Sequence, residues 1–449
     1  MEVSEEYSVV VEKFSNTGTG IAKVDGRVVF VEGACIGDCV KIKITKCNKN
    51  YSLATITEII KPSVYRVKPF CPMQKVCGAC QLQHIDYEYQ LELKRQAVAD
   101  TLRSIGKIDI DVNKTIPSPE IRGYRHKIQY PVSQTSVSKR ILAGYYKPQS
   151  HEIINIKYCP IQPEICDKII DYIRENSVKF NITGYNEKVG TGDLRHVVLR
   201  VSSASGKVLV TLVVNTDKLL KNAEGFAQNI YNNFKEVVGV CLNFNPKNTN
   251  VILSDKTICA AGQDYVEEKV LDKTFKIGAD TFFQVNPKSA ENIFKYVKEE
   301  IKKSENPTVL DAYAGIATFG ILVSDVSKEV VSVESNKSSI KKAQDVLALN
   351  SIKNVELHAA DTTKYLSKIK RKFDITILDP PRKGCTKESL DETLKHTKSK
   401  IIYVSCNPAT LARDLKYLLD KGCKLISVQP FDMFCHTYHV ETVAIIEVN

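Results

Sequence analysis

The chain has 449 residues, 43% of them hydrophobic and 26% charged, which predicts a soluble globular protein of two or three domains rather than one. No stretch reaches the ~18 apolar residues of a membrane-spanning helix, and the acidic N-terminus lacks the basic flank and apolar run of a secretory signal. We therefore expect a cytoplasmic protein without a membrane partner, whose 14 cysteines stay reduced. The net charge of +11 favours a polyanionic partner, although a solvated lysine-rich surface would give the same balance.

Short alternating segments broken by glycines fill the first part of the chain, at 8–12, 18–22, 27–31 and 38–44. Alternation with period two predicts a small closed β-barrel. The segment resembles the TRAM domain, a relative of the oligonucleotide/oligosaccharide fold that is fused to several RNA-modifying enzymes. Cations and an aromatic ring interleave in it, as on a surface that follows an RNA backbone: Lys41, Lys43, Lys46, Lys49 and Tyr51. A barrel that only packs against its neighbour is the alternative.

A cluster of cysteines follows, with Cys71, Cys77 and Cys80 in a C-x5-C-x2-C pattern and Cys159, followed by a proline, far downstream. Three close thiolates and one distant fourth suit an iron–sulfur cubane better than a tetrahedral zinc site, whose ligands usually come as two short-spaced pairs. Zinc remains the alternative. Because no second redox centre or flavin motif is visible, a structural role is the simpler interpretation of such a cluster.

The middle of the chain combines one predicted helix with two predicted strands. Residues 83–106 have apolar positions near the helical period, and 121–128 and 194–200 are β-like runs with cations at alternating positions. In such a strand one face can pack while the other meets phosphates. The best candidates for the phosphate-facing side are Arg122, Arg125 and Lys127.

Near Lys273 the pattern changes to alternating strands and helices. A strand at 308–312 runs into a turn of small residues and then a helix, and Glu334 ends the next strand nineteen residues past Gly315. A close-approach turn followed by a carboxylate about 20 residues on is the arrangement that binds a nucleotide in Rossmann folds. The turn is not G-x-G-x-x-G, which fits a cofactor without a pyrophosphate.

Three further strand ends carry reactive groups, in the motifs DPPR at 379–382, SCNP at 405–408 and HVE at 439–441. An apolar strand delivers Cys406 to the carboxyl edge of the expected sheet, just where a helix begins and favours thiolate over thiol. Taken alone, Cys406 could also be a small buried cysteine in a loop. The neighbouring motifs add two acids, Asp379 and Glu441, and one cation, Arg382. Their presence favours the interpretation of Cys406 as a nucleophile.

With these three motifs intact and in order, the chain resembles the RNA uracil-5-methyltransferases that use S-adenosylmethionine, over essentially its whole length. The resemblance implies an OB-like TRAM β-barrel over 1–62, a central α+β domain over 63–272 and an α/β Rossmann-like class I methyltransferase domain over 273–449. It also implies that the helix at 83–106 packs on the catalytic domain. In the ribosomal-RNA branch of the family, the same four cysteines hold a [4Fe-4S] cluster.

The resemblance assigns Cys406 as the nucleophile that attacks C6 of uracil and Glu441 as the acceptor of the C5 proton. Arg382 would stabilise the charge that develops on O4 or O2, and the phenylalanines at 282–283 would help to hold the base. The expected cofactor contacts are Gln284, Tyr313, Thr318, Glu334, Asp361 and Asp379. The chain departs from the family pattern at Ala314 and Ala317, where relatives carry cysteine and glycine, and at Cys435, where they carry proline.

These features predict a monomeric methyltransferase that acts on 23S ribosomal RNA and not on DNA. Methylation of the transfer RNA T loop is the alternative within the family. A radical or redox iron–sulfur enzyme would need a cluster with one open iron site. The fourth cysteine, Cys159, argues against this alternative because it supplies a fourth ligand. A non-catalytic RNA-binding protein would not need SCNP and HVE together.

Overall fold

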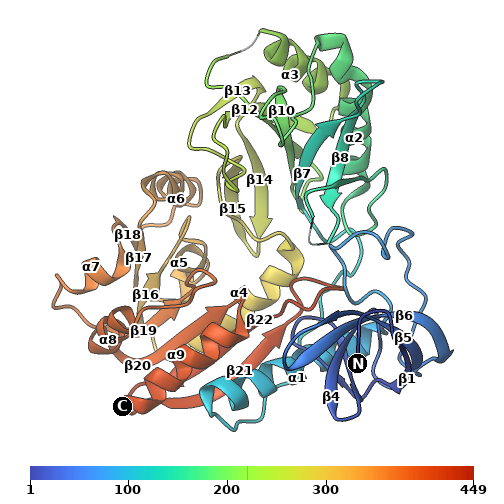
Figure 1. Ribbon diagram of the computed structural model, residues 1–449. Helices are drawn as coiled ribbons and strands as arrows, with labels where there is room; N and C mark the ends of the chain where they lie inside the picture. The colour runs from blue at the N-terminus through green and yellow to red at the C-terminus, as the bar shows by residue number, and fades with distance from the viewer. Residues whose placement is uncertain (149, 220) are drawn as a thin grey trace. The chain divides into compact units, whose positions relative to one another are not determined.

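The computed structural model describes residues 1–148, 150–219 and 221–449 (Figure 1). Its contacts divide the chain into two compact units. The first unit contains Met1–Ser118, Pro381–Gly384 and Val404–Ile445, and the second contains Pro119–Pro380, Cys385–Tyr403 and Ile446–Asn449. In the described ranges, no helix combines the length and the apolar character needed to cross a bilayer.

The N-terminal part of the first unit is a six-stranded sheet in the order β1-β5-β6-β4-β3-β2. Its strands are β1 (Glu6–Val10), β2 (Lys13–Phe14), β3 (Gly20–Val24), β4 (Arg27–Glu32), β5 (Cys39–Cys47) and β6 (Tyr51–Lys61). Strand β5 shows why the sheet wraps around one core, because Val40, Ile42 and Ile44 are buried and alternate with polar residues. The strands expected in this region are confirmed, and β6 was not predicted from the sequence.

The rest of the first unit contains the helix α1 (Tyr87–Thr101), the helix α9 (Pro408–Asp420) and the strand β21 (Lys424–Phe431). Asp86 caps α1 by accepting a hydrogen bond from the Tyr89 amide, and α1 continues into a π-helix at Leu102–Gly106. The π-helix packs closely on α9, since a Cβ atom at Gly106 would lie 3.0 Å from the Ala412 carbonyl oxygen. Strand β22 (Glu441–Glu447) begins in this unit.

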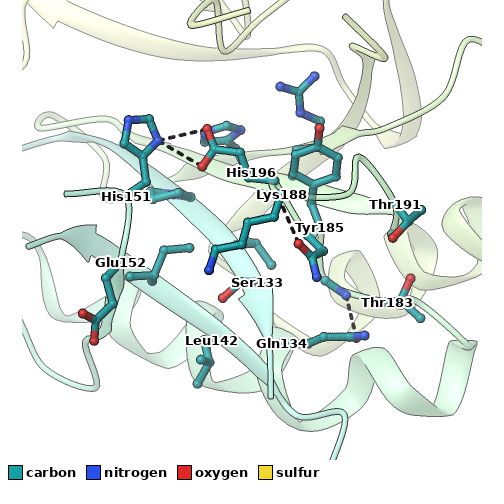
Figure 2. A pocket seen from close by; sticks show the side chains of 18 of the residues that line it. Ser133, Gln134, Leu142, His151, Glu152, Thr183, Tyr185, Lys188, Thr191 and His196 are labelled. Carbon is teal, nitrogen blue, oxygen red and sulfur yellow. Dashed lines mark hydrogen bonds and ion pairs between the residues drawn. The ribbon is translucent and has the colours of Figure 1, made fainter. Parts of the chain in front are cut away.

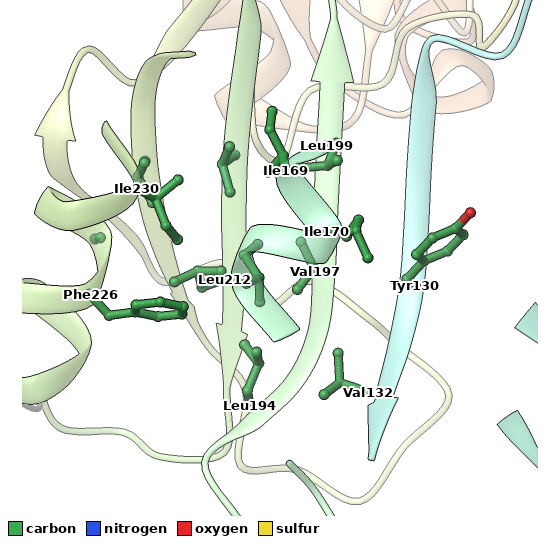
Figure 3. Close-up of a cluster of buried hydrophobic side chains, with 14 of the residues drawn as sticks. Tyr130, Val132, Ile169, Ile170, Leu194, Val197, Leu199, Leu212, Phe226 and Ile230 are labelled. Atoms are coloured by element: carbon green, nitrogen blue, oxygen red, sulfur yellow. The ribbon is translucent and has the colours of Figure 1, made fainter. Parts of the chain in front are cut away.

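A seven-stranded sheet in the order β13-β12-β11-β10-β7-β8-β9 forms the first part of the second unit. Its strands are β7 (Lys127–Gln134), β8 (Ile141–Tyr146), β9 (Ile153–Asn155), β10 (Leu194–Val201), β11 (Val208–Val214), β12 (Val237–Phe244) and β13 (Thr257–Gly262). Its helices are α2 (Glu164–Asn176), a 3-10 helix (Ser177–Phe180) and α3 (Lys221–Asn233). Figure 3 shows Ile170 of α2 and Phe226 of α3 in one apolar cluster with Val197 and Leu212 of the sheet.

The strand predicted at 121–128 is only partly correct. Residue Gly123 has a φ of 64°, and the sheet begins at Lys127. The amides of Gly123 and Arg125 donate instead to the carbonyls of Pro160 and Ile161, at 3.0 and 2.8 Å. An irregular loop therefore replaces the first part of the expected strand.

The remainder of the second unit has the alternating architecture expected near residue 273. A hairpin of β14 (Tyr265–Val270) and β15 (Lys273–Gly278) precedes parallel strands in the order β18-β17-β16-β19-β20. These strands are β16 (Thr308–Ala312), β17 (Glu329–Glu334), β18 (Val355–Ala359), β19 (Phe373–Leu378) and β20 (Thr397–Ser405), whose last two residues belong to the first unit. The helices are α4 (Pro287–Lys302), α5 (Thr318–Leu322), a 3-10 helix (Ser324–Val326), α6 (Lys337–Leu349), α7 (Thr362–Leu366) and α8 (Lys387–His396). This doubly wound order confirms the Rossmann-like class and places ligands at the carboxyl ends of the strands.

Candidate active site

The turn after β16 is the centre of the expected cofactor site. Tyr313, Gly315 and Ala317 all have positive φ, at 62°, 58° and 57°. The Glu334 carboxylate at the end of β17 holds the turn by accepting a hydrogen bond from the Gly315 amide at 3.0 Å. Alanine in the left-handed region costs about 1 kcal/mol, a strain that glycine does not carry. The departure from the family pattern at Ala317 therefore falls on a position where the backbone favours glycine.

A buried carboxylate, that of Asp311, stabilises the elements next to this turn. Asp311 accepts hydrogen bonds from the Gly320 amide at 2.9 Å and the Ser332 hydroxyl at 3.0 Å. Burial raises the pKa of Asp311 to about 7, and the charge of Glu334 adds to the shift. The pKa of Asp379 is also raised to about 7, first by burial and then by the charge of Asp311. Both acids therefore titrate near neutral pH.

The other predicted cofactor contacts of this unit lie at or beside the ends of neighbouring strands. The Tyr313 hydroxyl shares a hydrogen bond of 2.7 Å with Ser389 Oγ, and its pKa is raised mainly by burial and also by the charge of Asp361. Asp361 follows β18, is exposed and caps α7 by accepting from the Lys364 amide at 3.0 Å. Thr318 is the first residue of α5. The structure thus brings Tyr313, Glu334, Asp361 and Asp379 to one edge of the parallel sheet.

Gln284 lies in a separate segment of the same unit. It is half-buried, between β15 and α4, and its neighbour Phe283 is 4% exposed, whereas Phe282 is 67% exposed. The Phe283 ring packs 5.9 Å from that of Phe275. Phe283 is therefore a core residue, and Phe282 is the ring available to a ligand.

In the first unit, Cys406 stands at the junction of β20 and α9. The residue is half-buried, and helix α9 begins two positions later at Pro408. Asn407 caps the helix by accepting a hydrogen bond from the Ala409 amide at 3.1 Å. The positive end of a helix stabilises a thiolate close to its N-terminus.

The start of α9 also holds the end of the DPPR motif. Asn407 Nδ2 and Thr410 Oγ1 both donate to the Arg382 carbonyl oxygen, at 3.1 and 3.2 Å. Gly384, with a φ of 73°, lies so close that a Cβ atom would meet Asp414 Oδ2 at 2.6 Å. The main chain of 381–384 is therefore fixed relative to Cys406, while the Arg382 residue is exposed. The hydrogen bonds of Asn407 and Thr410 were not predicted, although SCNP contains a standard helix cap.

Glu441 is 4% exposed and is the first residue of β22. The turn that precedes it is bound to α1 through Asp432, which accepts hydrogen bonds from Lys94 Nζ at 2.5 Å and from the Tyr87 hydroxyl at 2.7 Å. Lys94 Nζ also donates to the Phe434 carbonyl at 3.0 Å. This buried ion pair was not predicted, because its partners are 338 residues apart and no local pattern connects them. It supports the expected packing of α1 on the segment that carries HVE.

Two other cysteines near the catalytic motifs, Cys435 and Cys385, are buried. Cys435 is fully buried, and burial followed by the charge of Asp432 raises the pKa of its thiol. Cys385 is 6% exposed and accepts a weak hydrogen bond from the Tyr403 hydroxyl at 3.7 Å. Neither has the strand-to-helix position of Cys406.

The expected metal ligands are divided between the units, with Cys71, Cys77 and Cys80 in the first and Cys159 in the second. Burial raises the pKa of the Cys77 thiol, and the charge of Cys71 adds to the shift. Over residues 1–148, 150–219 and 221–449, no group of three or more His, Cys, Asp or Glu side chains is arranged to hold a metal ion.

The cations of β10 do not form a phosphate-facing side, and this interpretation was wrong. Arg195 and Arg200 are each 5% exposed. Arg195 Nη1 donates to the carbonyls of Asn245 and Lys247 at 2.6 and 2.7 Å, and Arg200 Nη2 donates to the Thr281 carbonyl at 2.5 Å. Main-chain carbonyls from distant loops thus accept hydrogen bonds from both guanidinium groups, while Arg195 Nε is buried without a partner among the described residues.

The remaining RNA-facing candidates differ in exposure. Arg122 is exposed, whereas burial lowers the pKa of Lys127 to about 7, with the charges of Arg200 and Arg125 adding to the shift. On the barrel, Lys41 pairs with Glu6 at 2.8 Å. The exposed barrel candidates are Lys43, Lys46, Lys49 and Tyr51.

Two protein-family models match parts of this chain. A family model described as tRNA (Uracil-5-)-methyltransferase matches residues 200–448, and the TRAM domain model matches residues 1–57. An uncharacterized RNA methyltransferase of Clostridium tetani is 37% identical over 440 residues, covering 97% of this chain and 95% of the relative. A second one, from Synechocystis, is 35% identical over 435 residues, covering 96% and 94%.

Among solved structures, the chain is similar to the Pyrococcus abyssi tRNA (uracil-54, C5)-methyltransferase in complex with S-adenosyl-L-homocysteine. The TM-score is 0.79 at 27% identity, and the match covers 98% of this chain and 99% of that one. The family model spans more than half of the chain, and the relatives match it almost from end to end. This chain therefore belongs to the family of S-adenosylmethionine-dependent RNA uracil-5-methyltransferases.

Proposed function

We propose that this enzyme transfers a methyl group from S-adenosylmethionine to C5 of a uridine in 23S ribosomal RNA, through a covalent bond between Cys406 and C6. The observation that carries the proposal is the position of Cys406. It follows a buried strand and precedes a capped helix whose N-terminus stabilises a thiolate. We also propose that the enzyme works in the cytoplasm as a monomer on RNA.

A thiolate is needed because C5 of a neutral uracil ring is a poor nucleophile. Cys406 Sγ bonds to C6, and the electron pair of the C5–C6 double bond moves towards C5 and O4 to give an enolate. When bound, S-adenosylmethionine would supply an electrophilic methyl group to C5, and S-adenosyl-L-homocysteine would leave with the electron pair of the broken S–CH3 bond. The Glu441 carboxylate then removes the C5 proton, the double bond re-forms, and the C6–S bond breaks to release the thiolate.

Other residues of the chain position the reactants. Arg382 is exposed beside the anchored turn at 381–384 and stabilises the negative charge on O4 or O2 of the enolate. Phe282 is the exposed ring that would face the base. The base must leave its stack to reach Cys406, at a cost of a few kcal/mol that other RNA contacts offset.

The proposed cofactor site uses the carboxyl edge of the parallel strands. The proposed contacts are Gln284, Tyr313, Thr318, Glu334, Asp361 and Asp379. A Cβ atom at Gly315 would meet nothing within 4 Å, so the turn has open space for a ligand at this point. Glu334 would accept hydrogen bonds from the ribose hydroxyls, and Asp361 would bind near the adenine.

Variants of Cys406 and Glu441 test the covalent mechanism. Cys406→Ala should abolish methyl transfer but leave S-adenosylmethionine binding intact, because the sulfur acts only on the base. Glu441→Gln should allow attack and methylation but stall at release, so a methylated protein–RNA adduct resistant to denaturing electrophoresis should accumulate. The adduct should be absent from the double variant.

The measurements are tritium transfer to RNA, calorimetric binding of S-adenosylmethionine and denaturing gels. The exposed Cys259 provides the control, since Cys259→Ala should behave as wild type. Turnover by Cys406→Ala would exclude the covalent route. Normal product release by Glu441→Gln would assign the base to another group, with Asp379 or a water that it holds first in line.

We further propose that Cys71, Cys77, Cys80 and Cys159 hold a [4Fe-4S] cluster. The support is their spacing in the sequence. Protein purified without oxygen should be brown and contain about four irons per chain, and Cys159→Ser should bleach it while the exposed control Cys259→Ser should not. Stoichiometric zinc without visible absorbance would identify the other metal.

A transfer RNA substrate is the second candidate. It is favoured by the end-to-end similarity to a structure named as a tRNA (uracil-54, C5)-methyltransferase. The ribosomal assignment is supported by the TRAM domain together with the four-cysteine pattern.

A further inference from the structure

The second unit contains a pocket of about 1600 Å³ whose lining includes none of the proposed cofactor contacts (Figure 2). It is lined by β7, β8, β10 and the segments 183–192 and 249–252. We infer that this pocket binds a single-stranded segment of RNA, an inference that rests on the proposed RNA methylation.

The pocket lies where the sheet turns polar. In β7, Ile128 and Tyr130 enter the core that α2 and α3 cover, whereas Pro131 and Ser133 line the pocket. Val132 belongs to the same core and also lines the pocket, as does Gln134 at the end of the strand. The apolar core therefore gives way to the pocket lining along the second half of β7.

The size of the pocket favours a polymer. Sites for small molecules and cofactors usually have volumes of roughly 300–1,000 Å³. A volume of about 1600 Å³ exceeds this range and accommodates several nucleotides in succession.

The charges of the pocket favour an anion. Its two acids are paired, with Glu187 bound to His151 at 2.9 Å and Glu152 to Lys147 at 2.5 Å. Lys139 and Lys188 also line it, and neither forms an ion pair with any of the residues that the structure describes. Figure 2 shows the Lys188 side chain extending towards the middle of the pocket. Two ammonium groups are therefore available for phosphates.

The uncharged lining suits nucleobases and sugars. The Tyr146 ring is half-buried and lies 5.2 Å from the His151 ring at an interplanar angle of 38°. Aromatic rings stack on the faces of unpaired bases, and neutral polar groups read base edges and the 2′-hydroxyl. The neutral polar lining includes Ser133, Gln134, Thr135, Thr183, Asn186 and Thr191.

Part of the pocket lining is closely packed. The Arg195 guanidinium lies 4.8 Å over the Tyr185 ring while it donates to two carbonyls. Gly184 and Gly192 pack so closely that a Cβ atom on Gly192 would lie 2.3 Å from the Gly184 carbonyl oxygen. The two ends of the loop at 183–192 are therefore closely packed against each other, while residues 186–191 are exposed to solvent.

Two matched double variants of the full chain test the inference. Lys139→Ala/Lys188→Ala removes the two pocket cations, and Lys168→Ala/Lys179→Ala removes two cations from α2 and the 3-10 helix that follows it. The probe is a fluorescein-labelled 12-nucleotide oligouridine, and its binding is followed by anisotropy over a range of KCl concentrations. The pocket variant should bind about tenfold more weakly, with a salt slope smaller by about 1.4, since each phosphate contact on a single strand contributes about 0.7. The control should match wild type.

Tyr146 provides a test that does not depend on charge. Tyr146→Ala should weaken oligouridine binding about fivefold or more, and Tyr146→Phe, which keeps the ring, should restore it. Thermal unfolding of each variant verifies that the fold is retained. Equal weakening by Tyr146→Phe and Tyr146→Ala would exclude stacking.

The outcomes separate this inference from the proposed function. If wild type methylates RNA and the two lysine double variants bind oligouridine equally, the pocket is not an RNA site, and a protein partner becomes the occupant to test. If only the pocket variant loses oligouridine binding while wild type transfers no methyl group to RNA, the pocket inference stands and the proposed reaction falls. Methyl transfer by the pocket variant should show an increased KM with an unchanged kcat.

Discussion

Individual acids near the expected cofactor site combine a structural role with an unusual protonation state. Asp311 lies inside the unit and fixes both the start of α5 and β17 through its hydrogen bonds to Gly320 and Ser332. Its second oxygen, Oδ1, is buried without a hydrogen-bond partner among the described residues. Since ionising such a group has a high desolvation cost, its pKa of about 7 lies far above that of an exposed carboxyl.

This raised pKa predicts a definite dependence of stability on pH. The folded chain holds a proton on Asp311 that the unfolded chain releases near pH 4, so the contribution to stability is complete below pH 4 and is lost as pH rises towards 7. Asp379 titrates in the same range and steepens the loss. Asp311→Asn should flatten the curve by up to about 1.4 kcal/mol per pH unit, measured from urea-unfolding midpoints between pH 4.5 and 7.5.

Asp374 provides the control of opposite sign. Although partial burial opposes it, hydrogen bonds from Thr308 and Lys398 lower the pKa of Asp374 to about 2. Its contribution is present above pH 4 and disappears only as pH falls through 2, so Asp374→Asn should lower stability between pH 4.5 and 7.5 without changing the slope. Parallel curves for wild type and Asp311→Asn would contradict the assignment.

At the scale of elements, α1 and the turn before β22 form one buried polar assembly. Gln90, Leu93, Lys94 and Val98 follow helical spacing on the buried side of α1. Lys94 and Asp432 are 2% and 1% exposed, so each charge depends on the other. This ion pair thereby connects the segment before Glu441 with α1, a helix from the N-terminal part of the chain.

Removing one partner of this pair should be costly. Lys94→Met removes the cation that pairs with the buried Asp432 carboxylate, which should lower the free energy of unfolding by about 3–5 kcal/mol. The exposed pair of Lys295 and Glu291 on α4 gives the control, because Lys295→Met should cost about 0–1 kcal/mol. Urea unfolding measures both. Lys94→Met/Asp432→Asn should recover part of the loss, and equal losses for the two single lysine variants would show that the buried pair is unimportant.

The elements also show which features a sequence can predict. The turn at 313–317 and the strand-to-helix junction at Cys406 are local, because short runs of residues determine them. Glu334 was predicted because its distance of about 20 residues from the turn is typical of Rossmann folds. The burial of Arg195 and Arg200 depends on carbonyls at 245 and 281 that no local pattern reveals. The partnership of Lys94 with Asp432 was missed for the same reason.

At the scale of the whole molecule, the contacts group the chain differently from a simple succession of domains. The barrel shares its unit with α1, α9 and the segment 404–445, which carries both Cys406 and Glu441. The expected cofactor contacts, from Gln284 to Asp379, all belong to the second unit, as does the pocket lined by Lys139 and Lys188. The domain limits at 62 and 272 remain a prediction. Together with a net charge of +11, both units offer cations to a large RNA.

The natural substrate of the complete enzyme can be identified in its cell. In a strain that lacks this protein, 5-methyluridine should disappear from 23S ribosomal RNA, and a copy with wild-type sequence should restore it. Cys406→Ala should fail to restore it, because the adduct with C6 cannot form, whereas the exposed-cysteine control Cys259→Ala should succeed. Mass spectrometry of nucleosides from separately purified ribosomal and transfer RNA gives the answer. Loss of 5-methyluridine from the transfer RNA T loop instead would identify transfer RNA as the substrate. Unchanged 5-methyluridine in both RNAs would exclude the proposed reaction.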